Sequence, residues 1–234
     1  MKHELNILRQ LNHPNICSLW GYEKGMFGTP DVPSIVTEYC INGTLAEYLI
    51  KQAETLDILK RIKLIENILK AIEYLHDGIA QVTIVHGNIN TDSVVVDKYG
   101  IPKIQNFEFS HQYARDTLST LIPAPAYTPS LVPAHSRWHP PEFFIPTDDW
   151  PLVTRHADLW ATGCLLLKII SGQEPYSGTN VPAVFARIKN SEAPYSRGAC
   201  PSDEIWDVAG RLWVPNPLQR ISATKALQLI RLIV

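Results

Sequence analysis

The chain has 234 residues, of which 45% are hydrophobic and 19% are charged, and its formal net charge at pH 7 is -2. This is an ordinary globular balance, and it gives no electrostatic argument for binding nucleic acid or an acidic membrane surface. The four cysteines are widely spaced and form no C-x-x-C pair, which disfavours zinc-binding and thioredoxin-like classes. Residues 1–13 contain no apolar core of a secretory signal, and the apolar run 159–170 is too short to span a membrane. We therefore expect a cytoplasmic protein without a membrane span.

The first 76 residues predict a mixture of helices and strands. Leucines recur at helical spacing near the start, and His13-Pro14 ends that helix. After the turn at Asn42-Gly43, Thr44 is a candidate N-cap for a short helix. The predicted helices cover 3–11, 44–49 and 58–76, and the predicted strands cover 16–22 and 34–39.

Three short apolar runs follow, at 82–85, 94–96 and 101–104. The gap 97–100 between the last two ends in glycine, which predicts a hairpin. Around these runs lie polar side chains that are nearly all uncharged: His86, Asn88, Asn90, Asp92, Ser93 and Asn106. Loops at the ends of strands commonly carry sites. Here amides stand where acid chemistry would need carboxylates.

The rest of the chain predicts one long loop and then helices. Residues 111–136 are rich in Pro, Ser, Thr and Ala, so we expect them to be irregular. The predicted helices cover 157–171, about 181–190, 202–213 and 222–233. The whole order of elements, a helix, a few strands and then mostly helices, indicates the α+β class.

In this order the segments resemble the protein kinase family along almost the whole chain. The matching segments are E-L-N-I-L-R-Q-L-N-H-P-N-I, I-V-T-E-Y-C-I-N-G-T-L-A-E-Y-L, H-G-N-I-N-T-D-S-V-V-V-D, K-I-Q-N-F-E-F-S, R-W-H-P-P-E, A-D-L-W-A-T-G-C-L-L-L and R-L-W-V-P-N-P-L-Q-R-I-S-A. The resemblance implies a kinase-like fold. Residues 1–40 would be a remnant of the small lobe, with the regulatory helix and two strands, and residues 41–234 the helical large lobe. Three features favour the tyrosine-kinase-like branch: the hinge segment, R-W-x-P-P-E and L-W-x-P-N-P-x-Q-R.

The positions that carry phosphoryl transfer in that family are altered here. By the resemblance, the base, the loop lysine and the two magnesium ligands correspond to Asn88, Asn90, Ser93 and Asn106. An amide is not a base at neutral pH, and an uncharged side chain attracts a hard dication weakly. We therefore expect no catalytic residue, no metal site and no cofactor. The alternative is that Asp92 and Glu108 bind magnesium from new positions and ATP still binds.

The nucleotide-facing half of the small lobe is also incomplete in this sequence. Glu4 matches the regulatory-helix glutamate, but no glycine-rich loop or strand lysine precedes it. The hinge positions that would face a nucleotide are the gatekeeper Thr37 and then Glu38, Tyr39 and Cys40. We expect a truncated protein or an incomplete sequence, with apolar surface on strands 16–22 and 34–39 left uncovered. A protein partner, possibly another kinase domain or an upstream segment of the same protein, would cover it.

The resemblance implies that the architectural residues remain. The regulatory spine of the family corresponds to Leu8, Leu19, His86 and Phe107. The helix aspartate that anchors the catalytic loop corresponds to Asp158. A buried ion pair of the family corresponds to Glu142 and Arg220. We favour a packed spine histidine over a base or metal ligand for His86.

Several other polar residues have a functional and a plain interpretation. His135 and His139 match no strong zinc pattern, so we expect surface residues. Nothing in the sequence near Cys40 argues for a reactive thiol. Five hydroxyls of the long loop are candidate phosphosites or ordinary loop residues: Thr117, Ser119, Thr120, Thr128 and Ser130. Gly87 stands where the family has the arginine that receives such a phosphate, which favours the second reading.

Three functional hypotheses follow. The preferred one is a kinase homologue without phosphotransfer, acting as a protein-binding or allosteric signalling module. The second is a divergent or incomplete kinase that phosphorylates serine, threonine or tyrosine with ATP. The third is a degraded or mispredicted gene product without a stable fold.

Overall fold

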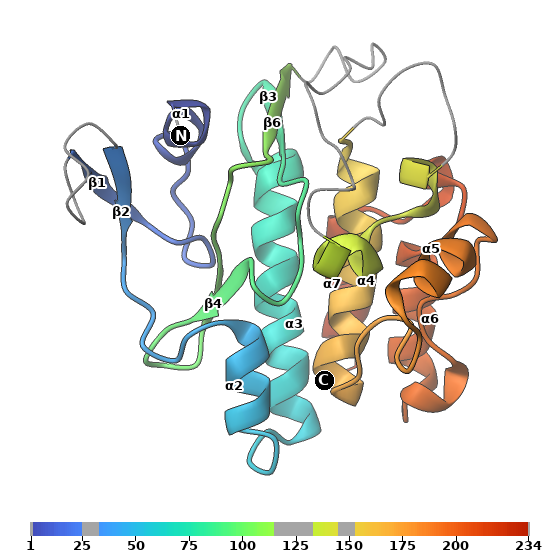
Figure 1. The fold of residues 1–234 in the computed structure, drawn as a ribbon. Coiled ribbons are helices and arrows are strands. Elements are labelled where there is room, and N and C mark those ends of the chain that lie inside the picture. Colours follow the sequence, from blue (N-terminus) through green and yellow to red (C-terminus); the bar gives the residue numbers. More distant parts are fainter. Residues whose placement is uncertain (1, 25–32, 115–132, 145–152, 234) are drawn as a thin grey trace.

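The computed structural model describes residues 2–24, 33–114, 133–144 and 153–233. Helix α1 (Lys2–Leu8) and two strands lie on one side, and the other six helices form the bulk of the other side, with four short strands between them (Figure 1). The helices are α1 (Lys2–Leu8), α2 (Leu45–Lys51), α3 (Ile58–Glu73), α4 (Arg155–Ser171), α5 (Val181–Lys189), α6 (Asp203–Leu212) and α7 (Ala223–Arg231). The strands are β1 (Leu19–Lys24), β2 (Pro33–Thr37), β3 (Val82–Val85), β4 (Val94–Val96), β5 (Pro102–Ile104) and β6 (His111–Ala114). This arrangement fits the predicted α+β class.

Two helices form the centre of the helical part. The side chain of Asp57 accepts a hydrogen bond from the backbone of Lys60 at 2.8 Å and begins α3, which buries one apolar face against α4 and α7. Thr154 caps the start of α4, and Gly172 ends it in the left-handed conformation with φ 74°. Helix α4 is buried on nearly all sides, as expected for an apolar helix at the centre of a domain.

The strands form three antiparallel pairs, β1 with β2, β3 with β6, and β4 with β5. The hairpin of β4 and β5 is confirmed, with Val94 opposite Ile104. The pairing of β3 with β6 corrects the expectation that residues 111–136 are irregular from their first residue. The strand expected from residue 16 begins at Leu19, and Ile16 instead forms an isolated bridge to Ile104.

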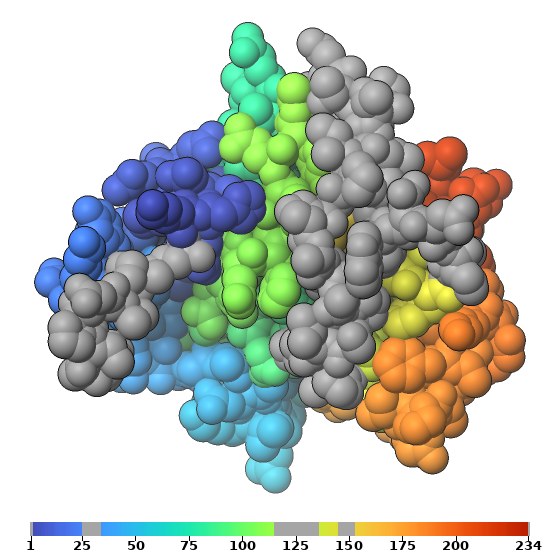
Figure 2. All heavy atoms as spheres, turned by 45° about the horizontal axis from the view of Figure 1, so that its top comes forward, coloured from blue at the N-terminus to red at the C-terminus, as the bar shows by residue number. Residues whose placement is uncertain are grey.

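Helix α1 lies beside the segment that contains β6 (Figure 2). The His3 ring is hydrogen-bonded to the carbonyl of Ser110 at 2.5 Å, and Gln10 donates to the side chain of Gln112 at 3.0 Å. The regulatory-helix counterpart is therefore packed onto the strand that follows the K-I-Q-N-F-E-F-S segment. In the described part of the chain, none of the helices combines the length and the apolar character needed to cross a membrane.

The five candidate phosphosites, Thr117, Ser119, Thr120, Thr128 and Ser130, lie outside the described residues. The side chain of His135 does as well. His139 is 5% exposed, so the expectation of a surface histidine is wrong. Its ring lies 5.4 Å from that of Phe143, in the 3-10 turn Pro141–Phe144 that follows it.

Candidate functional site at the loop 86–93

The backbone of this loop is fixed by one carboxylate from α4. Asp158, which is 1% exposed, accepts hydrogen bonds from the backbone N–H groups of His86 and Gly87, both at 2.8 Å. The ring of His76 lies 3.0 Å from the same carboxylate. A buried carboxylate needs several donors to offset its lost hydration, and here the loop supplies two of them. Asp158 therefore determines where the loop begins.

His86 is fully buried, and both of its ring nitrogens are used within the protein. Nε2 lies 2.9 Å from the carbonyl of Gln105, so it donates there, and Nδ1 accepts from the backbone N–H of Asn88 at 3.2 Å. Burial lowers the pKa of His86, which is consistent with this neutral form. Its ring meets that of Phe107 edge to face, with 4.9 Å between centroids. These contacts leave the ring with no nitrogen for a substrate or a metal.

The side chains of Asn88, Asn90 and Ser93 form a closed hydrogen-bond network. The Nδ2 group of Asn90 donates to the backbone and side-chain oxygens of Asn88, each at 3.1 Å. Its Oδ1 accepts from the backbone N–H groups of Asp92 at 2.7 Å and Ser93 at 3.1 Å. The Ser93 hydroxyl donates to the carbonyl of Asn90 at 3.0 Å and accepts from the N–H of Asn90 at 2.9 Å. The Asn88 side-chain oxygen, the Asn90 amide and the Ser93 hydroxyl are thus all bonded within the loop.

Asn106 and Glu108 lie on either side of the buried Phe107, and both are exposed. Asn106 has a positive φ of 62°, a conformation that asparagine tolerates better than most residues. Glu4 of α1 approaches this segment. Burial raises the pKa of Glu4, and the negative charge of Glu108 acts in the same direction, while a hydrogen bond from the backbone of Phe107 opposes it. The two glutamates therefore make this region acidic.

Three of the predicted spine residues lie in the main apolar core or against it. Leu8 and Phe107 belong to the same buried apolar cluster, and Leu19 is partly buried against it. This cluster joins α1 and β1 to the start of the loop through the ring of His86. Packing in the apolar core is sufficient to explain why these positions are apolar, and no ligand is needed to explain it.

The hinge positions line an open groove of about 420 Å³. Glu38 is held away from solvent by Lys103, whose ammonium lies 2.9 and 2.8 Å from the two carboxylate oxygens. Burial alone would raise the pKa of Glu38, but hydrogen bonds from Lys103 and Ser18 lower it below its usual value. Tyr39 is 81% exposed. The lining residues are Ser34, Ile35, Val36, Thr37, Glu38, Tyr39, Cys40, Val95 and Gln105.

The Glu142 and Arg220 side chains form a two-pronged ion pair, with Nη–Oε distances of 2.6 and 2.7 Å. The Arg220 side chain is 0% exposed. Its remaining N–H groups donate to the carbonyls of Val214, His156 and Pro215, and its guanidinium lies 5.0 Å from the centre of the Trp160 ring. All five guanidinium N–H donors are therefore used.

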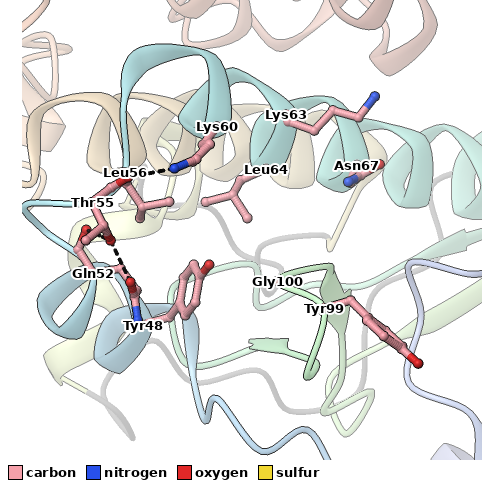
Figure 3. A pocket seen from close by; sticks show the side chains of 10 residues that line it. All are labelled: Tyr48, Gln52, Thr55, Leu56, Lys60, Lys63, Leu64, Asn67, Tyr99 and Gly100. Carbon is pink, nitrogen blue, oxygen red and sulfur yellow. Dashed lines mark hydrogen bonds between the residues drawn. The ribbon is translucent and has the colours of Figure 1, made fainter.

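A second groove, of about 430 Å³, lies where α2, the first half of α3 and the turn between β4 and β5 meet (Figure 3). Tyr48, Leu56 and Leu64 form its apolar part, and Lys60 donates to the Thr55 carbonyl at 3.0 Å along its rim. None of the residues in this groove was singled out from the sequence. It is separate from the loop 86–93 and shares no residue with the hinge groove.

Sequence reasoning also missed why Gly87 is a glycine. Its φ is +78°, and a Cβ built on it would lie 2.6 Å from the Phe109 carbonyl oxygen and 2.7 Å from Cγ1 of Val153. The arginine that the family has at this position would not fit this backbone. The sequence does show a glycine at position 87. It does not show that Phe109 and Val153 crowd this position, because both are more than twenty residues away along the chain. Among the described residues, no three His, Cys, Asp or Glu side chains gather in a way that could hold a metal ion.

Comparison with known proteins identifies the class. The sequence pattern of the family described as protein tyrosine and serine/threonine kinase matches residues 1–230. This chain therefore belongs to the protein kinase family. The fold and the order of the segments around the loop agree with that membership.

Individual relatives are distant. The chain is 24% identical over 226 residues to the cytokinesis protein sepH of Emericella nidulans, a match that covers 96% of this chain and 15% of that protein. It is 27% identical over 228 residues to the serine/threonine-protein kinase SIK2 of Gallus gallus, covering 96% and 25%. It is 28% identical over 170 residues to the pollen receptor-like kinase 1 of Petunia integrifolia, covering 72% and 20%. The chain thus spans a quarter or less of the length of these relatives.

Proposed function

We propose that this kinase-family domain does not transfer phosphate and acts as a protein-binding or allosteric module. The observation that carries the proposal is the network of Asn88, Asn90 and Ser93, in which the Asn88 side-chain oxygen, the Asn90 amide and the Ser93 hydroxyl all bond within the loop. Phosphoryl transfer needs a carboxylate for the substrate proton and charged or oxygen ligands for magnesium. An amide network that is satisfied internally offers neither without being broken.

Assays of phosphate transfer test this directly. The purified chain and its Asn88→Ala variant are incubated with labelled ATP and magnesium, alone and with a generic protein substrate. We expect the same background incorporation from both, because position 88 has no base to lose. Incorporation by the unaltered chain clearly above that of Asn88→Ala would contradict the proposal.

The second candidate, a divergent kinase with ATP and magnesium as cofactors, is supported by the open groove at Thr37, Glu38, Tyr39 and Cys40. Thermal stability with ATP, with and without magnesium, separates the two candidates. Under our proposal magnesium adds nothing to any shift that ATP produces. An Asn106→Asp variant is the matched positive control, because it restores one charged magnesium ligand at the exposed position after β5. A magnesium-dependent shift in the unaltered chain would favour the second candidate.

A protein partner is part of the proposal, and the chemistry of β1 supports one. Trp20 is 69% exposed and Tyr22 is 51% exposed, and both belong to β1. Arg9, directly after α1, adds a cation 6.0 Å from the centre of the Tyr22 ring. Aromatic and arginine side chains are the residues enriched at protein interfaces. We propose another kinase domain or an upstream segment of the same protein as the partner.

Titration of immobilised chain with isolated kinase domains tests the partner. We expect a Trp20→Ser/Tyr22→Ser double variant to weaken binding, and a Tyr99→Ser variant to leave it unchanged, because Tyr99 is 74% exposed on the far hairpin turn. Equal weakening by both variants would argue against β1 as the contact. We also propose that the chain belongs to the tyrosine-kinase-like branch, on the motifs given above, and that it is located in the cytoplasm, because residues 1–13 have no apolar signal core.

A further inference from the structure

Two of the four cysteines lie together directly behind the hinge groove. Cys17 is 3% exposed and Cys40 is 7% exposed, and with Val95 they form a small buried cluster of their own. Each thiol is close enough to the other to influence its pKa. Cys40 also lines the hinge groove, whereas Cys17 does not. One member of a contacting thiol pair is therefore reached from an open surface.

The ends of β1 and β2 bring the two cysteines near each other. Leu19 lies opposite Thr37, and the N–H of Glu38 donates to the carbonyl of Ser18 at 3.0 Å. Cys17 precedes Ser18 and Cys40 follows Glu38 by two residues, so both lie just beyond this end of the strand pair. There the two side chains pack together with Val95.

The charges around the pair keep both sulfurs as thiols. Burial raises the pKa of each, and the nearby carboxylate of Glu38 acts in the same direction. The nearby cation, Lys103, is bound to Glu38 and so opposes this only in part. Asp97 adds a further negative charge near Cys40. Oxidation of these two thiols should therefore be slow. Which disulfide forms should depend on the contact between Cys17 and Cys40 and not on a high reactivity of either thiol.

We propose that Cys17 and Cys40 are a dithiol modification site, which a peroxide converts to an intramolecular disulfide that joins β1 to the hinge. The thiolate of Cys40 attacks one peroxide oxygen, so a sulfenic acid forms and one water leaves. The thiol of Cys17 then attacks that sulfur, the S–S bond forms and a second water leaves. The two sulfurs are oxidised by two electrons in total and hydrogen peroxide is reduced to two waters.

The disulfide would act on the hinge groove. It would close the chain between residues 17 and 40, and Cys17 is already tied to β5 through its N–H bond to the Ile104 carbonyl at 2.9 Å. The hinge would then be covalently linked to Cys17, whose backbone is hydrogen-bonded to Ile104 of the main apolar core. The Cys40 sulfur would also be withdrawn from reagents in the groove. This inference does not depend on whether the domain transfers phosphate.

Mass spectrometry of the folded, full chain after treatment with hydrogen peroxide and alkylation tests the proposal. We expect a product lighter by two hydrogens, with a cross-linked peptide pair containing Cys17 and Cys40, and loss of alkylation at these two residues only. Cys164 and Cys200 provide an internal control, because both are buried and neither belongs to the small cluster. A Cys164→Ala/Cys200→Ala variant should give the same cross-link, and Cys40→Ala should give none.

Three results would overturn the proposal. One is stepwise oxidation of Cys40 to the sulfinic acid with Cys17 unchanged. Another is a cross-link that includes Cys164 or Cys200. The third is a share of the Cys17–Cys40 link among all disulfide products that is no higher in the native chain than in urea, where contact between the thiols is lost. The comparison with urea needs no variant, so the test stands even if Cys40→Ala fails to fold.

Discussion

The loop 86–93 and the Glu142–Arg220 pair differ in the charge of their side chains. In the loop, amides and a hydroxyl bond to one another, and the charged side chains expected from the family resemblance are absent at three positions, Gly87, Asn88 and Asn90. In the pair, a guanidinium that is fully buried keeps a carboxylate and three carbonyls as partners. Charges bonded inside the protein are present, whereas charges that would serve a ligand are missing. The fold can therefore persist without the reaction.

Removal of Arg220 should have the largest effect on this comparison. Arg220→Ala leaves Glu142 without its partner and three carbonyls without a donor, so we expect a loss of about 3–5 kcal/mol in the free energy of unfolding. Asn88→Ala should cost about 1 kcal/mol or less, because Asn90 still donates to the Asn88 carbonyl. Urea denaturation measures both.

The matched control is Arg211→Ala. Arg211 pairs with Asp207 at 2.8 Å, but the two side chains are 52% and 55% exposed. Exposed pairs contribute little, so we expect a change within about 0.5 kcal/mol. Similar unfolding midpoints for Arg220→Ala and Asn88→Ala would mean that the buried pair does not stabilise the fold as described.

The anchor of the loop should come next in size. Asp158→Asn replaces an acceptor of two backbone N–H groups by an amide whose NH2 faces one of them. We expect a loss of about 2–3 kcal/mol, since hydrogen bonds to a charged group contribute the most. Asp207→Asn, on an exposed side chain, is the control and should be nearly neutral. Hydrogen exchange of residues 86–88 should also accelerate, and unchanged protection there would refute the anchoring role.

Glycine substitutions sharpen the comparison at the loop itself. Gly87 and Gly172 have nearly the same φ, 78° and 74°, but a Cβ at Gly172 would meet nothing within 4 Å. Gly172→Ala should therefore cost only the left-handed conformation, about 1–2 kcal/mol. Gly87→Ala adds contacts with Phe109 and Val153 and should cost about 1–3 kcal/mol more. Equal unfolding free energies for the two variants would show that the backbone of the loop shifts freely.

The sequence predicts the parts of the fold that depend on local periodicity. The apolar spacing over 58–76 identified α3, and the short gap ending in Gly100 identified the hairpin of β4 and β5. The pairing of β3 with β6 was missed. His111 and Tyr113 share one face of β6, but four residues are too few for alternation to stand out, and the partner strand lies about thirty residues earlier. Pairing over that distance depends on tertiary packing.

At the site, residue types were predictable and their bonds were not. The amides of the loop could be named from the sequence, but that Asn90 bonds to Asn88 and to two backbone N–H groups depends on side-chain orientation. His139 was placed on the surface because its spacing from His135 matches no strong zinc pattern. It is buried because the turn that follows packs its Phe143 ring against it. Neither the hydrogen bonds of Asn90 nor the burial of His139 produces a periodic pattern of apolar residues in the sequence.

The smallest predicted effect extends the influence of Arg220 to a neighbouring side chain. Burial, together with the positive charges of Arg155, Arg220 and His76, lowers the pKa of His156 to about 4 from an unfolded value of 6.5. Between these values the unfolded chain binds the proton more tightly. The resulting contribution to stability is complete above about pH 6.5 and is lost as the pH falls toward about 4.

Comparison of His156→Gln with the unaltered chain isolates this contribution. Because His156 is partly exposed, we expect the unaltered chain to lose only about 1 kcal/mol more than the variant between about pH 7 and pH 5. The difference between the two, followed across pH by urea denaturation, excludes His13, His86 and His111, whose lowered pKa values are common to both chains. A difference that stays constant with pH would show that the surroundings of His156 do not shift its titration. A difference that grows as the pH falls would show that burial, together with the positive charges of Arg155 and Arg220, disfavours the protonated ring at the start of α4.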